Sequence, residues 1–336
     1  MKILKSRSFQ SLKTWILCFA ISGSFLAHPA TASTLIISGK KNVIIANQSF
    51  SNPNGDCVQV TNSSNIQFNN VNIGPCKGNG ILVSNSKTLT IVNSTIHNTT
   101  ANGIALGSSS KINIHDNNFS TNQAGVYVVR STSVKVDFNN FLNPQGPIPR
   151  GQFVQFNGVT GPDNEINCNI GENILGQGNP IDSINIYKSY GTASSPIKVV
   201  GNKIKGGGPN KSGGGIMLGD NGGGYITADS NIVVNPGQYG IAVANGTYIT
   251  MSNNKVFGVM QPFTNVGMYV WSVKPELGPC ANISVIDNQV DYTNKLGNKN
   301  NFWNGKNCGP ILMSGNDFKT PLSASIIDNP IPACAR

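Results

Sequence analysis

The sequence predicts an all-β fold in which one strand-rich unit repeats along the chain and stacks into a solenoid. Short segments with strand alternation recur every two to three dozen residues, and a second, asparagine-containing motif falls between them. Only 11% of the residues are charged, whereas 38 are glycine. Disordered chains usually carry more charge and fewer β-branched residues, so the composition favours an ordered fold with a polar surface.

The first motif places apolar residues at every second position, which is the pattern of a half-buried strand. It occurs as GILVSNS from residue 80, GIALGSS from 103, GVYVVRS from 125, QFVQFNG from 152, SINIYKS from 183, GIMLGDN from 215, GIAVANG from 240 and GMYVWSV from 267. Each copy predicts one strand of one repeat.

The second motif has an apolar pair two positions apart, an asparagine five positions after the first of them, and another apolar residue. It occurs as INIHDNNF (112–119), VKVDFNNF (134–141), IKVVGNKI (197–204), ITMSNNKV (249–256) and ISVIDNQV (283–290). The asparagines in register are Asn117, Asn139, Asn202, Asn254 and Asn288. Asparagine tolerates the left-handed backbone of a sharp bend, and its amide can bond to neighbouring backbone. We therefore expect a ladder of stacked amides.

Two or three strands per repeat, joined by Gly/Asn turns, bury an apolar face if each repeat forms one coil of a parallel stack. A β-sandwich would need hairpin signals at regular spacing, which this chain lacks. The repeats, from about Thr34 to Asp328, resemble the right-handed parallel β-helix of the pectate-lyase-like superfamily. The resemblance implies the architecture, while no specific catalytic family matches. We predict an all-β, right-handed parallel β-helix with N- and C-terminal caps.

Residues 1–32 have the features of a secretory signal peptide: a basic leader, the apolar core WILCFAISGSFLA and the cleavage pattern Ala30-Thr31-Ala32. The apolar run is shorter than the roughly 20 residues of a membrane span, and no later segment is a candidate. Residues 33–336 are then one β-helix domain of a secreted or periplasmic protein, expected to be a monomer. The start, TLIISGKKNVIIANQSF, and the tail 321–336 are expected to seal the two ends of the stack.

The chain is basic, with 24 Lys and Arg against 14 Asp and Glu and a net charge of +10. Four of the basic residues lie in the leader, so removing it leaves +6. We expect a basic secreted protein to bind an anionic polysaccharide or surface rather than nucleic acid.

Six cysteines follow the leader, and export permits disulfides. The expected pairs are Cys57–Cys76 and Cys280–Cys308. Cys168 takes the inward position that Ile114, Val136 and Val199 hold in related coils, so we expect it to be a buried, inert thiol. Cys334 is then unpaired, or competes for Cys280 or Cys308. No cysteine or histidine spacing is typical of zinc.

Equivalent positions of successive coils stack about 4.8 Å apart, so the repeat converts the sequence into columns on the outer surface. The first column contains Gln155, Asn185, Met217, Ala242 and Tyr269. The second contains Val129, Asn157, Tyr187, Gly219, Ala244 and Trp271. The third, at the end of the strands, contains Arg130, Gly158, Lys188, Asp220 and Asn245. On the entry side lie Arg150, Asp182 and Tyr239.

These columns predict a carbohydrate groove, because aromatic rings can stack on sugars and amides can bind hydroxyls. The candidate substrate-binding residues are Arg130, Gln155, Asn157, Asn185, Tyr187, Tyr239, Asn245, Tyr269 and Trp271. Long inserts gather beside this face, as expected for a site on a rigid scaffold. One of them, GGGPNKSGGG (206–215), is expected to be either a mobile turn or a closely packed one. The alternative for the face is that outward aromatics on a β-surface have no function.

The candidate catalytic residues are Lys188, Asp220, Arg150 and Asp182. A glycoside hydrolase needs two carboxylates about 5–10 Å apart. Asp182 and Asp220 are the best two, but six strand positions at about 3.3 Å each separate them by roughly 15–20 Å. This estimate disfavours hydrolysis. The paired-aspartate and Gly-His-Gly signatures of polygalacturonases are also missing.

A polysaccharide lyase needs a base, usually Lys or Arg, and Ca²⁺ or Arg to neutralise the uronate. Lys188, Arg130, Arg150 and Asp220 supply these residue types. Without a metal, Asp220 one coil from Lys188 favours the charged lysine, and the two form only a surface ion pair. Calcium on Asp220 reverses that effect, so Ca²⁺ is the one cofactor left open.

An alginate-type epimerase would rely on histidine, but only His97 and His115 follow the leader, both beside the asparagine motif. We expect a secreted polysaccharide-active protein that acts on an acidic, uronate-containing glycan by β-elimination. The alternatives are a glycoside hydrolase on the same scaffold and a glycan-binding or surface protein without catalysis. A buried cluster of groups with shifted pKa values would indicate an enzyme rather than a binding protein.

Overall fold

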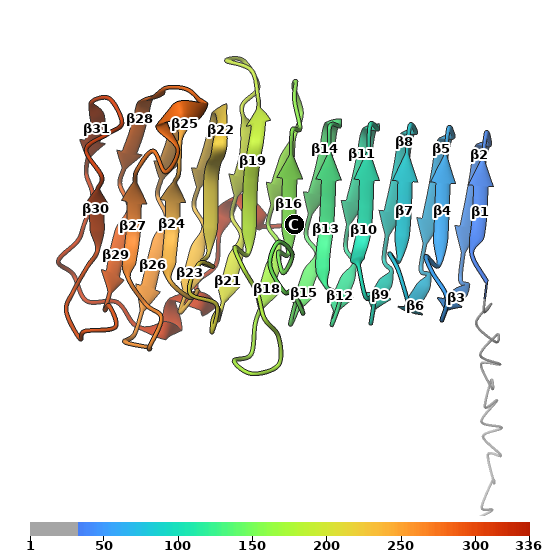
Figure 1. The fold of residues 1–336 in the computed structure, drawn as a ribbon, viewed down its shortest axis with the longest axis horizontal. Coiled ribbons are helices and arrows are strands. Elements are labelled where there is room, and N and C mark those ends of the chain that lie inside the picture. Colours follow the sequence, from blue (N-terminus) through green and yellow to red (C-terminus); the bar gives the residue numbers. More distant parts are fainter. Residues whose placement is uncertain (1–32) are drawn as a thin grey trace, which may run out of the picture.

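The computed structural model describes residues 33–336, and the expected signal peptide lies outside this range. The described chain winds into a solenoid whose strands pair in parallel with their counterparts one coil away (Figure 1). Three ladders of strands form its faces, which confirms the predicted parallel β-solenoid. Among these residues, no helix is long and apolar enough to cross a membrane.

The three ladders follow one another in each coil. The first contains β1 (Leu35–Ser38), β4 (Val58–Thr61), β7 (Ile81–Ser84), β10 (Asn102–Gly107), β13 (Ala124–Val129), β16 (Val154–Asn157), β19 (Ile184–Tyr190), β22 (Ile216–Asp229), β24 (Tyr239–Val243), β27 (Val266–Val270) and β30 (Phe302–Asn304). The second contains β2 (Lys41–Ala46), β5 (Ser64–Asn69), β8 (Lys87–Val92), β11 (Ser110–His115), β14 (Thr132–Asp137), β17 (Glu165–Asn167), β20 (Ile197–Val200), the end of β22, β25 (Gly246–Ser252), β28 (Cys280–Ile286) and β31 (Ile311–Ser314). The third contains β3 (Ser49–Asn52), β6 (Asn72–Cys76), β9 (Thr95–His97), β12 (Asn118–Ser120), β15 (Asn140–Leu142), β18 (Ile170–Glu172), β21 (Lys203–Lys205), β23 (Ile232–Val234), β26 (Lys255–Gly258) and β29 (Gln289–Tyr292).

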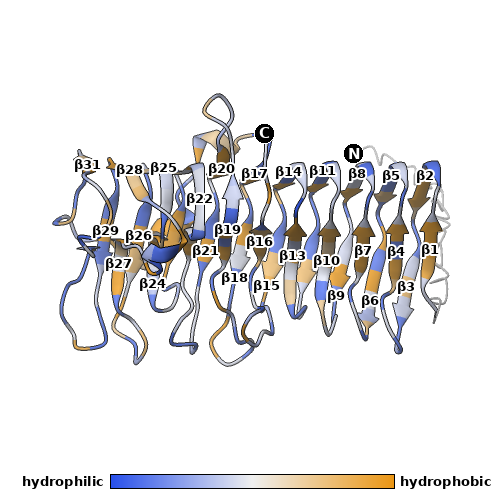
Figure 2. Ribbon diagram, turned by 45° about the horizontal axis from the view of Figure 1, so that its top comes forward, coloured by the Kyte–Doolittle hydropathy of each residue, from blue (hydrophilic) through white to orange (hydrophobic). Residues whose placement is uncertain are grey.

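The core is a set of apolar stacks that run along the solenoid axis. In the first ladder Val126, Val154 and Ile184 pair in register from β13 to β19, and all three side chains are buried. Figure 2 shows the corresponding apolar segments recurring from coil to coil. Burying one such side chain contributes about 2 kcal/mol, so the stacked apolar positions stabilise the coil-to-coil register.

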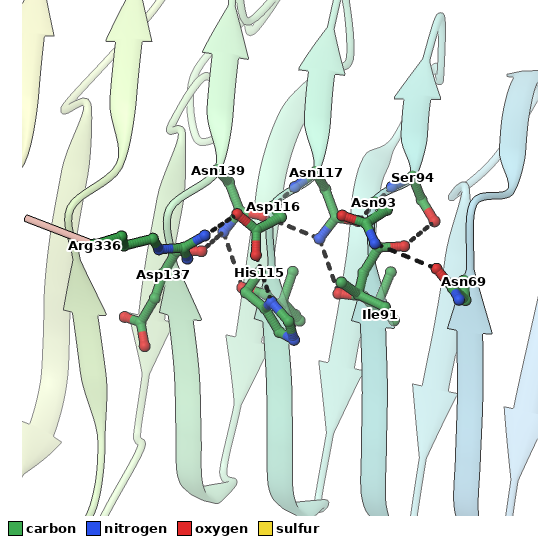
Figure 3. Close-up of polar contacts among 12 residues, drawn as sticks. Asn69, Ile91, Asn93, Ser94, His115, Asp116, Asn117, Asp137, Asn139 and Arg336 are labelled. Atoms are coloured by element: carbon green, nitrogen blue, oxygen red, sulfur yellow. Dashed lines mark hydrogen bonds and ion pairs between the residues drawn. The ribbon is translucent and has the colours of Figure 1, made fainter. Parts of the chain in front are cut away.

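The asparagine ladder forms as predicted at the bend between the second and third ladders. Asn117 Nδ2 donates to the Ile91 carbonyl (2.9 Å) and to Asn139 Oδ1 (3.0 Å), as Figure 3 shows. The same bonding continues through Asn169, Asn202, Asn231, Asn254, Asn288 and Asn316. Asn169, Asn231 and Asn316 were not in the predicted set, because their flanking residues depart from the motif.

The disulfides correct the prediction for two cysteines. Cys57–Cys76 and Cys280–Cys308 are bonded as expected. Cys168, expected to be an inert thiol, instead pairs with Cys334, expected to be unpaired. Cys168 has a positive φ of 55°, so it sits in the bend rather than pointing into the core as an aligned strand residue would.

The tail does not seal the end of the stack. The 3₁₀ helices η2 (Ala324–Asp328) and η3 (Pro332–Cys334) pack beside β23, where Ile326 and Ile331 form an apolar cluster with Ile232 and Val234. The third 3₁₀ helix of the described residues, η1 (Pro275–Leu277), lies after β27. The chain thus runs back along the solenoid to its middle (Figure 1).

The last residue holds the tail at the asparagine ladder. The Arg336 guanidinium forms an ion pair with Asp116 and lies 3.4 Å from the centroid of the Phe138 ring. His115, expected to bond locally, contacts Asp116 Oδ2 through Nδ1 at 2.7 Å (Figure 3). The tail is therefore a lateral strap held by a disulfide, an apolar cluster and an ion pair.

Replacing Asn202 with alanine should destabilise the fold by about 3 kcal/mol, because buried partners on both sides lose their hydrogen bonds. Asn202 is fully buried, its Nδ2 bonds Ile166 O and Asn231 Oδ1, and its Oδ1 accepts from Asn169. Denaturant unfolding measures the change. The control Asn118→Ala, at an exposed strand position, should cost under about 1 kcal/mol; equal losses would contradict the ladder's role.

Replacing Cys334 with serine should release the strap. The disulfide closes a loop of 166 residues, and opening a loop of that size lowers the free energy of unfolding by up to about 5 kcal/mol. Limited proteolysis should remove residues 321–336 from Cys334→Ser and Cys168→Ser at the same rate, and far more slowly from the parent chain. A tail equally protected in all three proteins would contradict this.

Candidate carboxylate site in the groove

The first predicted column is confirmed by the strand register. Gln155 pairs with Asn185, Asn185 with Met217, Met217 with Ala242, and Ala242 with Tyr269. The column continues to Trp303 in β30. These positions alternate with the apolar core residues, so their side chains lie on the outer surface of the first ladder.

The middle of this column forms the floor of a groove. Outward side chains on an open sheet are normally exposed, yet Gln155 is 8% exposed and Asn185 is 2% exposed. Met217 and Ala242 are also buried, whereas Trp303, two coils further on, is exposed. The neighbouring turns and side chains therefore rise above the column in the central coils and leave it at the bottom of a depression.

A β-bulge changes the register of Asp220. Asn185 pairs with Met217, but Tyr187 pairs with Asp220, so β22 contains one extra residue over this stretch. Gly219 absorbs it with φ +64°, and a Cβ there would lie 2.0 Å from the Asn245 carbonyl oxygen. Only glycine fits this position. Asp220 thus belongs beside Tyr187, and its predicted register with Lys188 is wrong.

The bulge brings two carboxylates together on one amide. Asn185 Nδ2 donates to Asp182 Oδ2 at 2.7 Å and to Asp220 Oδ2 at 3.0 Å. The two oxygens therefore lie within 5.7 Å of each other, the two bonds added together. The separation of 15–20 Å expected from strand positions is wrong, because Asp182 precedes β19 and its side chain turns toward Asn185.

Tyr239 completes the buried end of this network. Its hydroxyl donates to Asp182 Oδ1, and both side chains are almost fully buried. Gly214 makes this contact possible, since a Cβ at that residue would lie 2.5 Å from Tyr239 Cζ. The glycine-rich insert is therefore a closely packed turn, in which Gly208 packs in the same way against Phe263.

The surroundings of the two carboxylates favour their protonated forms. Burial raises the pKa of Asp182 to about 6, with a further contribution from the charge of Asp220, against the hydrogen bonds from Tyr239 and Asn185. Burial also raises the pKa of Asp220, against the Asn185 hydrogen bond and the charges of Lys274 and Lys188. Asp220 is less buried and faces two cations, so it loses its proton before Asp182 does.

An apolar and aromatic surface continues the groove toward the C-terminal coils. Met217, Tyr239, Ala242, Ala244 and Val266 form a hydrophobic cluster outside the main core, with Tyr269 packed on it. The Tyr269 ring meets Tyr239 edge-on at 5.3 Å and Trp303 at 6.3 Å between centroids. Trp271 packs against Trp303 at 5.6 Å. Trp271 and Trp303 are 37% and 44% exposed, so both can contact a ligand.

The cationic candidates lie at the rim. The Lys188 ammonium is 5.3 Å from the centroid of the Tyr187 ring, and in the described chain it makes no ion pair with Asp220. The Arg150 guanidinium lies 3.9 Å from the Tyr127 ring centroid, against the strand before Gln155. Arg130 is exposed, beyond the end of β13. None of the three touches the carboxylate pair.

Two amide candidates have partners of their own. Asn245 is fully buried, accepts from the Gly246 N–H at 2.7 Å and donates to the Lys274 carbonyl at 3.2 Å. It supports the bulge and the following loop, so its predicted substrate contact is wrong. Asn157 pairs with Tyr187 and donates to the Tyr127 hydroxyl at 2.8 Å, which places it on the N-terminal side of the groove.

Sequence reasoning missed Lys274 and Trp303. Lys274 follows β27 in the segment before Cys280, and Trp303 lies in β30, which does not carry the first repeat motif. The run of three aromatic residues at Tyr269, Trp271 and Trp303 was the available signal, but only the first two follow the repeat. Disulfide Cys280–Cys308 joins the coils from which Lys274 and Trp303 come.

The site does not fit calcium. Within residues 33–336 no three His, Cys, Asp or Glu side chains are grouped to hold a metal. Calcium takes six to eight oxygen ligands. Here the nearest oxygens of Asp182 and Asp220 both accept from the Asn185 amino group, which occupies the space between them. We therefore derive no step through a metal.

Asp182 should make stability depend on pH. The unfolded carboxyl ionises at its ordinary value of 3.8, while the folded one keeps its proton to about pH 6. The free energy of unfolding therefore falls as pH rises from about 4 to about 6, by about 3 kcal/mol from this group. Asp182→Asn should remove that part of the decline, measured by urea unfolding at several pH values.

Two other carboxylates serve as references for this measurement. Burial also raises the pKa of Asp137 to about 6, so a separate decline should persist in Asp182→Asn. The exposed control Asp163→Asn should follow the parent chain at every pH. An unchanged slope in Asp182→Asn would contradict the raised pKa.

Comparisons with known proteins agree with this fold. A family model described as "Right handed beta helix region" matches residues 21–141. Among solved structures, a variant GH87 α-1,3-glucanase catalytic domain with tetrasaccharides has a TM-score of 0.57 at 14% identity, covering 85% of this chain and 62% of its own. The same type of domain with nigerose has a TM-score of 0.54 at 15% identity, covering 85% and 63%.

A double mutant of the periplasmic alginate epimerase AlgG has a TM-score of 0.48 at 10% identity, covering 86% of this chain and 77% of its own. None of the curated proteins matches this chain. The chain spans less than two thirds of the glucanase domains, and at these identities the likeness is one of fold. The chain is a right-handed parallel β-helix protein of the pectate-lyase-like type.

Proposed function

We propose that this chain is a secreted, polysaccharide-active protein that hydrolyses glycosidic bonds at the Asp182–Asp220 pair. The observation that carries the proposal is the position of two carboxylates within 5.7 Å on the floor of a groove. Retaining glycosidases use two carboxyl groups about 5–5.5 Å apart, and inverting ones use groups about 6.5–9.5 Å apart. The bound amide places this pair in the retaining range.

Unequal environments give the two carboxylates different roles. Asp182 is the more buried, and its pKa of about 6 keeps it protonated in mildly acidic solution. It is therefore the candidate general acid. Asp220 is half-buried at the groove surface and ionises first, beside Lys188 and Lys274. It is the candidate nucleophile, and Asn185 holds both groups in place.

The walls of the groove support a glycan as the ligand. Trp271, Trp303 and Tyr269 follow the carboxylates along the solenoid axis, and their rings offer apolar surfaces to sugar rings. The glucanase structures named above are catalytic domains in complex with oligosaccharides on the same kind of solenoid. The three disulfides suit an oxidising compartment, which agrees with the expected secretion.

β-Elimination on an acidic glycan is the second candidate. The net charge of +10 favours it, as do the cations at the rim, with Lys188 as the base. Its weakness is geometric, because Lys188 lies over Tyr187 and not beside the carboxylates.

Activity assays should separate the two candidates. The purified chain is incubated with neutral and acidic polysaccharides, and reducing ends are followed together with the ultraviolet absorbance of unsaturated uronate. Hydrolysis gives reducing ends alone. Asp220→Asn and Asp182→Asn should each lower kcat by about 10²–10⁴-fold, and the limb of the pH profile near 6 should disappear in Asp182→Asn.

Lys188→Ala and the exposed control Asp163→Asn should keep at least half of the activity. Absorbance that rises with the reducing ends and vanishes in Lys188→Ala would replace hydrolysis by β-elimination. Folded Asp220→Asn with full activity would overturn the site assignment.

A further inference from the structure

The groove floor is unusual in having used its hydrogen-bond donors on itself. Both hydrogens of Asn185 Nδ2 go to the two carboxylates. The Tyr239 hydroxyl goes to Asp182, and the Gln155 amino group points to Asn185 Oδ1 at 3.4 Å. Only the weakly held Tyr269 hydroxyl, 3.9 Å from Met217 Sδ, is left.

Acceptors, by contrast, remain free. Gln155 Oε1 is buried and has no hydrogen-bond partner among the described residues. Carboxylate oxygens can each accept more than one bond, so Asp220 at the groove surface keeps acceptor capacity. A buried acceptor without a partner costs about 1–3 kcal/mol, and a ligand that donates to it recovers that free energy.

The orientation of Gln155 follows from its neighbours. The two carboxylates force Asn185 to present its amino group to them, which leaves Asn185 Oδ1 facing Gln155. Gln155 must then turn its own amino group to Asn185, because two carbonyl oxygens would repel each other. The free Oε1 is thus a consequence of the carboxylate pair.

The cations that could receive a negative group are placed elsewhere. Lys188 and Lys274 are exposed, and Arg150 is engaged with Tyr127. An acidic sugar on the floor would meet two carboxylates and a free carbonyl oxygen, whereas a neutral sugar brings hydroxyl donors to all three. The charge on the floor therefore opposes the positive charge of the whole protein.

We propose that the sugar unit bound on the groove floor is a neutral hexose or pentose, and that Gln155 Oε1 accepts a hydrogen bond from one of its hydroxyl groups. This inference rests on the proposed function, in that it takes a glycan to bind in this groove. Gln155 is accordingly a specificity-determining residue, and an acidic unit of the same polymer is confined to the rim at Lys188 and Lys274.

Binding and cleavage are measured separately to test it. Retardation in gels containing dextran, laminarin, xylan, polygalacturonate or alginate gives binding, and reducing ends give cleavage. The neutral polymer that binds best is then compared with its own C6-oxidised or carboxylated derivative, which changes the charge and keeps the linkages. We expect the neutral parent to bind at least tenfold more tightly.

Gln155→Met keeps the side-chain length and removes the acceptor. It should weaken binding of the neutral polymer about five- to tenfold, the effect of one neutral hydrogen bond, and leave binding of the oxidised form unchanged. Gln152→Met is the matched control. Gln152 is also a buried glutamine with a free Oε1, but it donates to the Pro149 carbonyl and not to the carboxylate network. It should bind like the parent chain.

Each outcome decides one proposal. Failure to bind any neutral polymer, tighter binding of the oxidised derivative, or equal losses in Gln155→Met and Gln152→Met overturns the inference. Cleavage of acidic polymers alone, without ultraviolet absorbance, keeps the hydrolase and removes the neutral-sugar inference. Gln155-dependent binding of a neutral polymer without cleavage of any kind keeps the inference and removes the hydrolase.

Discussion

The stacking register between coils is the constraint on which the rest of the molecule depends. Buried amides bond directly from coil to coil, as Asn139 does with Asn169 and Asn202 with Asn231. A slip of one residue would turn every apolar side chain outward and break each of these bonds at once. Because the register is fixed so strongly, one local departure from it can be tolerated without loss of the fold.

The bulge at Gly219 is that departure, and it creates the site. The core partners Ile184 and Ile216 stay in register before it, and Ile197 and Ile226 stay in register after it. Only the outward residue between them changes, from a glycine to Asp220. Asn185 then meets a carboxylate on each side. Bulges next to active sites commonly re-aim one side chain in this way.

The sequence predicts the periodic part of the structure well and the aperiodic part poorly. The first column from Gln155 to Tyr269 and the two short-range disulfides follow from the repeat, because a regular coil converts spacing into geometry. The position of Asp220 does not, since an extra residue in one strand leaves the apolar pattern on either side intact. The Cys168–Cys334 bond also escapes, because the tail has no repeat to align.

Asp182 argues that this groove is built for chemistry and not for stability. A carboxylate excluded from water is costly when ionised, and the described residues place three donors but no cation in contact with it: Tyr239, Asn185 and the Gly214 N–H. An apolar side chain at the same place would pack against Tyr239 without that cost. A fold that keeps a carboxylate with a raised pKa beside a second carboxylate gives up stability for it, and such clusters are typical of catalytic sites. The rigid ladder on the opposite bend is what allows the molecule to tolerate the loss.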